Sequence, residues 1–275
     1  MSTTEGSQSR WNDTDYLKGI QYATSENLDA RLSLHAKYST APTSWLEWLH
    51  AQIDWSNARV VLDVGCGTGN FWSAVTEPLP LELTLCDISP AMLARAQVAA
   101  ISRVRSVRAI EASLEDLPLR DDFCDVVLAN HMLYHVPDVA RGVSELRRVL
   151  GAHGFLVAST IGPSHMRELK EIGNSVFGGR SAGAGDFFGP VSGRRYLEER
   201  FTQVEWRSYD DELMCTEPKD VVAYFMSVLP RERVTEEHVR RLFEEIARRS
   251  DAGGLRITKE AGVFLARGGS ALTVH

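Results

Sequence analysis

The 275-residue sequence contains no apolar run of about 18 residues, the length that a membrane-spanning helix requires. Its first fourteen residues, MSTTEGSQSRWNDT, are polar and lack the apolar segment of a secretory signal, so we expect a loose N-terminal tail. The four cysteines are far apart and include no Cys-x-x-Cys pair, which argues against a disulfide framework. These absences favour a cytoplasmic protein with free thiols and no membrane partner.

The sequence also lacks a basic stripe. Its formal net charge is −7, and its arginines are scattered among acidic residues. Because an acidic surface repels phosphate backbones, we do not expect a nucleic-acid partner. The hydrophobic fraction of 44% is in the normal globular range, and the length suits one large α/β domain with a cap.

Strand and helix patterns alternate from residue 59 onward. Short, nearly all-apolar segments are typical of parallel strands that are buried on both faces. The expected strands are RVVLDV (59–64), LELTLCD (81–87), SVRAIEA (106–112), CDVVLAN (124–130) and GFLVAST (154–160). Helices are expected from the glycine turn to about residue 77, over 88–100 with Ser89 as N-cap, and over 138–150 with Asp138 as N-cap. This alternation predicts a doubly wound α/β sheet.

Both flanks of this region are expected to add further elements. Residues 1–57 are predicted to form a tail and a helical cap, with helices over 14–38 and 41–53, before a main domain over 58–275. The glycine-rich stretch near 162–195 breaks the rhythm and is either a plain surface loop or a lid that contacts the acceptor. A strand near 202–209, helices near 217–229 and 235–248, and a strand pair over 255–267 are expected to complete the chain.

The segment VVLDVGCGTGN (60–70) ends a strand in three glycines at alternate positions. Glycines have no Cβ, so the backbone can turn tightly here and lie against a ligand beyond the carboxyl end of the strand. Asn70 stands where the G-x-G-x-x-G fingerprint of dinucleotide sites needs its third glycine. Asp63 would repel a pyrophosphate but suits an ammonium group, and Asp87, which ends the second strand, suits ribose hydroxyls. An adenosine with an amino-acid tail, S-adenosylmethionine, meets these demands.

Four motifs of the sequence resemble those of a known enzyme family. VLDVGCGTG, LCDISPAML, LEDLPLRDDFCDVV and NHMLYHVPD followed by ELRRVLGAHGFLV resemble class I S-adenosylmethionine-dependent methyltransferases, nearest to the small-molecule branch. The resemblance covers roughly residues 58–160 and implies a Rossmann-like, seven-stranded, mostly parallel sheet with an antiparallel last strand. It places the cofactor on Asp63, Gly65, Cys66, Gly67, Asp87, Ile88, Met92, Ser113, Leu114 and Asn130. Family members often carry an acid at the position of Ser113, so adenine recognition is assigned either to this hydroxyl or to the backbone N–H of Leu114.

The segment YATSENLDARLSLHAKYST (22–40) resembles the leading helices of bacterial natural-product methyltransferases. One such group is the terpenoid C-methyltransferases of the teleocidin pathway, which methylate a prenyl-indole alkene and trigger ring closure. This resemblance implies that the N-terminal helix covers the cofactor, presents Tyr22 to it, and is exchanged between subunits of a homo-oligomer. A helix that only packs against the domain is the alternative.

Histidines follow the fourth expected strand. Methyl transfer displaces an excellent leaving group, so positioning and desolvation supply much of the catalysis. His135 is on the ligand side of the sheet and is a candidate base, and His131 is a second candidate, although either residue can equally well be a packing residue. The string HMLYH lacks the Glu of His-Glu-x-x-His and a third ligand, so no metal is expected.

The sequence therefore predicts an S-adenosylmethionine-dependent methyltransferase that acts on a small-molecule natural product. The finer expectation is C-methylation of a prenylated indole or terpenoid alkene with coupled cyclisation. O- or N-methylation of another secondary metabolite is the alternative within this class. Two other classes remain open, a nicotinamide-dependent oxidoreductase and a protein that binds the cofactor without consuming its methyl group. A protein or RNA methyltransferase is a further alternative, which the net charge of −7 and the lack of a basic stripe disfavour.

Overall fold

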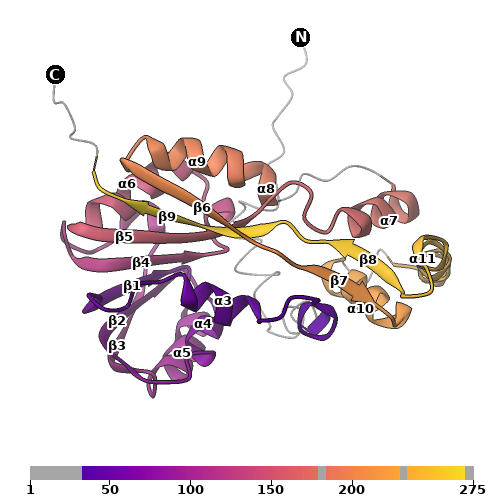
Figure 1. Cartoon of the computed structure of the whole chain (residues 1–275), viewed down its shortest axis with the longest axis horizontal. Helices are drawn as coiled ribbons and strands as arrows, with labels where there is room; N and C mark the ends of the chain where they lie inside the picture. Colours follow the sequence, from indigo (N-terminus) through magenta and orange to yellow (C-terminus); the bar gives the residue numbers. More distant parts are fainter. Residues whose placement is uncertain (1–32, 179–183, 230–233, 270–275) are drawn as a thin grey trace, which may run out of the picture. The chain divides into compact units, whose positions relative to one another are not determined.

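The computed structural model describes residues 33–178, 184–229 and 234–269, and the chain forms two compact units (Figure 1). We call the larger one the sheet unit; it consists of Trp45–Gly162, Ala184–Tyr209 and Ala261–His275. The other, which we call the helical unit, consists of Met1–Ser44, Pro163–Gly183 and Asp210–Glu260. Within the described ranges, no helix has the length and apolar character needed to cross a membrane.

A seven-stranded sheet with the order β3-β2-β1-β4-β5-β9-β6 forms the centre of the sheet unit. Its strands are β1 (Val60–Val64), β2 (Leu79–Asp87), β3 (Val104–Glu111), β4 (Cys124–Asn130), β5 (Leu150–Ile161), β6 (Gln203–Tyr209) and β9 (Ala261–Arg267). The first five strands pair in parallel, and β9 runs antiparallel between β5 and β6. The predicted doubly wound, mostly parallel seven-stranded sheet is therefore confirmed. Its strand order reverses at β1 and β4, where such sheets bind ligands.

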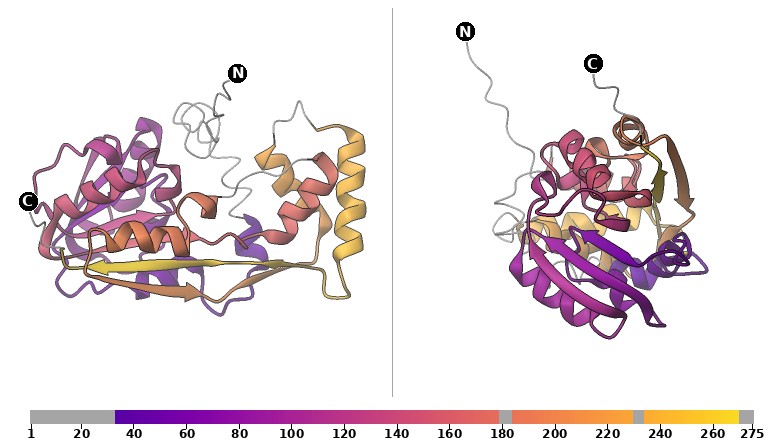
Figure 2. Two further views of the ribbon diagram at one scale, coloured as in Figure 1. Left: turned by 90° about the horizontal axis from the view of Figure 1, so that it is seen from above. Right: turned by 90° about the vertical axis from the view of Figure 1, so that its left-hand side faces the viewer.

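The helices of the sheet unit lie on both faces of the sheet (Figure 2). They are α3 (Trp45–Ala51), α4 (Asn70–Ser73), α5 (Pro90–Ala100), α6 (Val139–Val149), α8 (Ala184–Phe187) and α9 (Pro190–Glu198), with short 3-10 turns η2 (Leu114–Asp116) and η3 (Leu133–His135). The central strands are buried on both faces, as the successive residues Val61 and Leu62 of β1 illustrate with 0% exposure each. This double burial explains why these strands read as continuous apolar runs.

The predicted N-caps are confirmed. The Ser89 hydroxyl accepts a hydrogen bond from the Met92 N–H at the start of α5, and Asp138 Oδ1 accepts one from the Arg141 N–H at 3.0 Å at the start of α6. The helix after the glycine turn is shorter than predicted: α4 ends at Ser73 and not near residue 77.

The helical unit has a core of its own. It contains α7 (Arg167–Phe177), α10 (Pro218–Val228), α11 (Glu236–Arg249) and a two-stranded sheet of β7 (Glu212–Cys215) and β8 (Leu255–Thr258). Leu169, Ile172, Leu213, Leu242 and Ile257 are buried together there. Helical residues 33–38 add Leu34 and Tyr38 to this core.

Two strands form within residues 255–267, as predicted, but the prediction that they pair with each other is wrong. β8 pairs with β7 in the helical unit, whereas β9 joins the large sheet. The two residues between them, Lys259 and Glu260, are not the Gly or Asn residues that a tight hairpin turn needs, so the chain does not fold back on itself here.

The division into units also differs from the expected boundary between residues 57 and 58. The chain passes between units after Ser44, and residues 210–260, which the sequence assigned to the main domain, fold with residues 33–44. The expected insertion near 162–195 contributes to both units, and its role as a lid stays a prediction.

Candidate functional site

The glycine turn connects β1 to α4 at the point where the strand order reverses. Gly65, Gly67 and Gly69 have φ values of 61°, 54° and 76°, a left-handed region that side chains with a Cβ seldom occupy. The turn closes with a hydrogen bond from the Gly69 N–H to the Cys66 carbonyl at 3.0 Å. The alternate glycines are thus a backbone requirement of this turn.

The surroundings of the three glycines differ. A Cβ at Gly65 would lie 2.8 Å from the Cβ of Met132, and a Cβ at Gly69 would lie 2.7 Å from the Cα of Ala96 in α5. A Cβ at Gly67 would meet nothing within 4 Å. Gly65 and Gly69 therefore allow close packing, while Gly67 leaves open space beside a bare backbone, as a bound ligand needs.

Asp63 is on β1, two residues before the first glycine, and is only 2% exposed. Its Oδ2 accepts a hydrogen bond from the Trp72 indole at 2.8 Å, while Oδ1 has no partner among the described residues. Burial raises the pKa of this carboxyl to about 7, the nearby Asp87 raises it further, and the indole hydrogen bond opposes the rise. A buried oxygen without a donor is costly, so the site favours a ligand that brings a donor or a positive charge.

Asp87 ends β2 and ties the glycine turn to α5. Its Oδ2 accepts from the Gly67 N–H at 2.9 Å, and its Oδ1 accepts from the Ser89 N–H at 2.9 Å. A carboxylate oxygen can accept more than one hydrogen bond, as the predicted contact with a ribose diol requires. The carboxylate therefore has a structural role in the turn, and its contact with a ribose stays a prediction.

Asn130 ends β4 beside β1. Its Oδ1 accepts from the Ser159 hydroxyl at 3.4 Å, and within the described ranges its buried Nδ2 has no partner. The next residue, His131, has a φ of 51° and donates its N–H to the Ser159 carbonyl at 3.1 Å. A non-glycine residue in this conformation stores strain, and such strain is concentrated at functional sites.

The remaining predicted cofactor residues lie after β1, β2 and β3. Ser113 caps η2, and its hydroxyl accepts from the Glu115 N–H at 3.2 Å, so it is already engaged locally. Leu114 and Met92 are buried, and Ile88 is half-buried. The Cys66 thiol lies 3.8 Å from the Gly67 carbonyl, and burial raises its pKa far above the ordinary value, so it stays protonated.

The predicted catalytic histidines lie in one group of aromatic rings. The ring of Tyr134 is 4.6 Å from that of His135 and 6.5 Å from that of His131. The His131 ring is also 5.1 Å from Trp45, whose ring is 5.3 Å from that of Tyr209. Tyr22, the third predicted residue, lies outside the described residues.

The sequence interpretation missed the part that Trp45 and Tyr209 play in this group. It placed residue 45 in the helix expected over 41–53 and gave it no part in the site, and nothing in the spacing of residue 209 connects it to residue 131. The register of strands β5, β9 and β6 brings residue 209 to this part of the sheet. Tyr209 of β6 and Ile161 of β5 both pair with Ala261 at the same edge of the sheet.

The glycine turn, the paired carboxylates and the strand order agree with a sequence comparison. Residues 62–158 match the family model described as a methyltransferase domain. This segment is therefore similar to a methyltransferase domain. The cofactor of such domains is S-adenosylmethionine, in agreement with the cofactor predicted from Asp63 and Asp87.

Curated relatives align with parts of the chain. Malonyl-acyl-carrier-protein O-methyltransferases from Methylovorus and from Halorhodospira halophila are each 30% identical, over 41% and 60% of this chain and 40% and 55% of the relatives. A probable S-adenosylmethionine-dependent methyltransferase of Mycobacterium tuberculosis is 33% identical over 41% of this chain and 44% of the relative. The chain thus spans about half the length of the curated relatives it matches.

Solved structures share the fold. A Bacillus halodurans protein described as a candidate methyltransferase has a TM-score of 0.56 at 17% identity, covering 83% of this chain and all of its own. The YcgJ protein of Bacillus subtilis has a TM-score of 0.54 at 16% identity, covering 82% of this chain and 99% of its own. The (4+2)-cyclase SpnF has a TM-score of 0.53 at 15% identity, covering 92% of this chain and 97% of its own.

The segment that matches the methyltransferase model fits S-adenosylmethionine on three observations. Open space lies beside the Gly67 backbone, and two buried polar atoms, Asp63 Oδ1 and Asn130 Nδ2, have no partner in the described part of the chain. They belong to the adjacent strands β1 and β4, which meet at the reversal of strand order.

Proposed function

We propose that this chain is an S-adenosylmethionine-dependent methyltransferase with a small-molecule acceptor. The observation that carries the proposal is the open Gly67 backbone flanked by the carboxylates of Asp63 and Asp87. When bound, the cofactor supplies an electrophilic methyl group on a sulfonium centre. In this proposal Asp63 binds the ammonium group of the methionine tail, Asp87 binds the ribose hydroxyls, and Ser113 or the N–H of Leu114 holds the adenine.

The buried carboxylate of Asp63 favours this cofactor over a nicotinamide dinucleotide. Its negative form would repel a pyrophosphate, and Asn70 replaces the third glycine of the dinucleotide fingerprint. Binding of S-adenosylhomocysteine without binding of NADH is the expected result in a calorimetric comparison. Binding of NADH without binding of S-adenosylhomocysteine would instead indicate a nicotinamide-dependent oxidoreductase.

The acceptor is proposed to be a natural product with an apolar or flat surface. Trp45, Tyr209 and His131 bring three rings together directly after Asn130, and aromatic faces stabilise both apolar groups and cations. The finer proposal is carbon methylation of a prenylated indole or terpenoid alkene, in which the rings stabilise the carbocation that precedes cyclisation. The curated relatives named as O-methyltransferases support oxygen methylation as the second candidate.

His135 is proposed to assist proton loss from the acceptor. Its place in η3, after the strand that ends at Asn130, motivates this role. His135→Gln should lower kcat while leaving the affinity for S-adenosylhomocysteine unchanged, and His153→Gln, an exposed site on β5, is the matched control. Full turnover by the His135 variant would show a packing role instead.

The N-terminal segment is proposed to cover the cofactor and to be exchanged between subunits of a homo-oligomer, with Tyr22 facing the cofactor. Removal of residues 1–30 should lower turnover more than it lowers the melting temperature. It should also reduce the molecular mass measured by light scattering from that of the oligomer to that of the monomer. Full activity and unchanged mass would overturn this part of the proposal.

The experiment that tests the function uses S-adenosylmethionine labelled in its methyl group. Purified protein is mixed with three acceptor sets: prenylated indoles and terpenoid alkenes, phenolic and amine metabolites, and malonyl-acyl-carrier protein. Mass spectrometry locates the label, and Asp87→Ala, which removes the ribose acceptor, is the inactive control. Label on carbon supports the finer proposal, and label on oxygen or nitrogen selects the second candidate. Cofactor binding without transfer to any set would favour a protein that does not consume the methyl group.

A further inference from the structure

An arginine of α6, Arg148, binds the segment that follows β3 through several hydrogen bonds. Its guanidinium makes five hydrogen bonds, which use all of the donors that the side chain has. Three of the acceptors belong to the segment, and they are the Leu117 carbonyl at 3.0 Å, the Leu119 carbonyl at 2.6 Å and Asp121 Oδ1 at 2.9 Å. The other two are the carboxylate oxygens of Glu145, each at 2.7 Å.

Glu145 completes the attachment. Its Oε2 also accepts the Leu117 N–H at 3.0 Å, so both backbone groups of Leu117 are bound by the Glu145–Arg148 pair. The two side chains are one helical turn apart and are 18% and 30% exposed, which protects their contact from solvent. The Asp121 contact is different, because a side chain that is 76% exposed contributes little as an ion pair.

A second attachment fixes the start of the same segment. Glu115 Oε1 accepts the N–H of Asp138, the N-cap of α6, at 3.0 Å, and Glu115 Oε2 lies 3.4 Å from the Ser113 hydroxyl. Both ends of α6 therefore hold residues 113–121. Because loops are otherwise mobile, this double attachment fixes the conformation of the segment before any ligand arrives.

We infer that Glu145 and Arg148 are positioning residues for cofactor recognition by Ser113 and Leu114. The inference rests on the proposed function, since that is what assigns adenine recognition to these two residues. Arg148 binds the segment at residues 117–121, and none of its five contacts involves Ser113 or Leu114. It acts through the backbone, by keeping the segment in one conformation so that binding does not have to order it.

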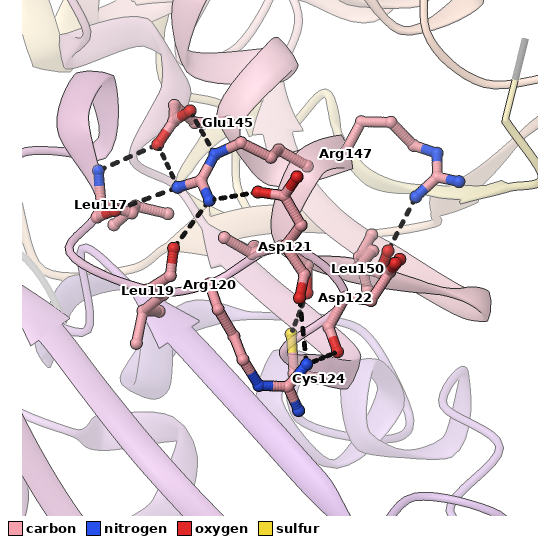
Figure 3. A network of polar contacts seen from close by, with 11 residues as sticks. Leu117, Leu119, Arg120, Asp121, Asp122, Cys124, Glu145, Arg147 and Leu150 are labelled. Atoms are coloured by element: carbon pink, nitrogen blue, oxygen red, sulfur yellow. Dashed lines mark hydrogen bonds and ion pairs between the residues drawn. The ribbon is translucent and has the colours of Figure 1, made fainter.

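The chain offers matched variants. Arg148→Lys keeps the positive charge but replaces the planar fork by one ammonium group, which cannot reach the carbonyls of Leu117 and Leu119 and both oxygens of Glu145 together. Arg147→Ala removes an arginine from the next position of α6, where its guanidinium donates to the Leu150 carbonyl and not to the segment (Figure 3). Glu145→Gln tests the carboxylate of the pair. It also takes the place of Arg148→Lys in the measurements if the Arg148 variant does not fold.

The experiment combines two measurements on the full chain. Hydrogen exchange followed by mass spectrometry reports the protection of residues 113–121 without ligand, and calorimetry reports the affinity for S-adenosylhomocysteine. Arg148→Lys and Glu145→Gln are expected to exchange faster in this segment and to bind roughly tenfold more weakly, while Arg147→Ala matches the wild type in both. The change should appear in the affinity and in KM rather than in kcat at saturating cofactor.

The outcomes separate this inference from the proposed function. Faster exchange with unchanged affinity would show that the pair merely stabilises a loop, and unchanged exchange would show that the segment does not need the pair. Either result overturns the inference while the wild type still binds S-adenosylhomocysteine. A wild-type protein that binds no S-adenosylhomocysteine would overturn the proposed function itself, and the positioning role with it.

Discussion

The indole of Trp72 donates a hydrogen bond to Asp63 Oδ2 at 2.8 Å in the fully buried centre of the sheet unit. This contact satisfies one oxygen of a carboxylate whose other oxygen has no partner in the described residues. Trp72 is therefore both a large core side chain and the hydrogen-bond donor to one oxygen of Asp63. The next two predictions depend on this pair.

Trp72→Phe should destabilise the protein by about 1–3 kcal/mol through the unsatisfied carboxylate, in addition to the lost packing. Urea unfolding at pH 8, where the carboxylate is ionised, measures the change. Trp206→Phe is the control, since its indole donates to the Ser208 hydroxyl at an exposed site of the same unit. Equal losses in the two variants would mean that the Asp63 contact contributes little.

Asp63 should make the sheet unit less stable as pH rises. Its pKa is about 7 in the folded protein, whereas the ordinary pKa of an aspartate side chain is 3.8, so between these values the folded state binds more protons than the unfolded state. Stability therefore falls from about pH 4 to about pH 7 and then levels off. Asp63→Asn should flatten this decline in denaturation midpoints measured across the range. A variant with the wild-type slope would contradict the raised pKa.

His35 should give the helical unit the opposite slope. Burial, and then the charge of Lys259, lower its pKa from 6.5 to about 4, while Asp211 opposes the change. The unfolded state thus binds more protons between these values, so stability rises from about pH 4 to about pH 6.5. Hydrogen exchange resolved by segment should show this rise in α7 and α11, and His35→Gln should remove it. A parallel slope in both units would refute the assignment.

Gly67→Ala and Gly69→Ala should separate ligand contact from packing. Both residues have positive φ, so each variant carries similar backbone strain. The added Cβ at Gly69 also overlaps Ala96, which should cost about 1–3 kcal/mol more. Gly67→Ala should stay the more stable of the two in thermal unfolding and should lose more affinity for S-adenosylhomocysteine. Full affinity in that variant would place the ligand elsewhere.

Local chemistry made much of the fold predictable from the sequence. Apolar runs identified the central strands, Ser89 and Asp138 marked the helix starts, and the alternate glycines marked the turn. These signals act over a few residues, so they are readable without the tertiary structure. The family resemblance supplied the seventh strand and the direction of the last one.

The tertiary structure decided what depends on residues far apart in the chain. Pairing of β8 with β7 rather than with β9 depends on backbone hydrogen bonds between segments some 40 residues apart, and no local preference encodes them. The meeting of Trp45, His131 and Tyr209 depends in the same way on strand order and register. The five hydrogen bonds of Arg148 could not be predicted from the sequence either, because the sequence around an arginine in a helix does not indicate which distant groups it will bind. The sequence by itself determined the strands, the caps and the glycine turn, whose causes are local. Which segments became neighbours was settled only by packing the whole chain.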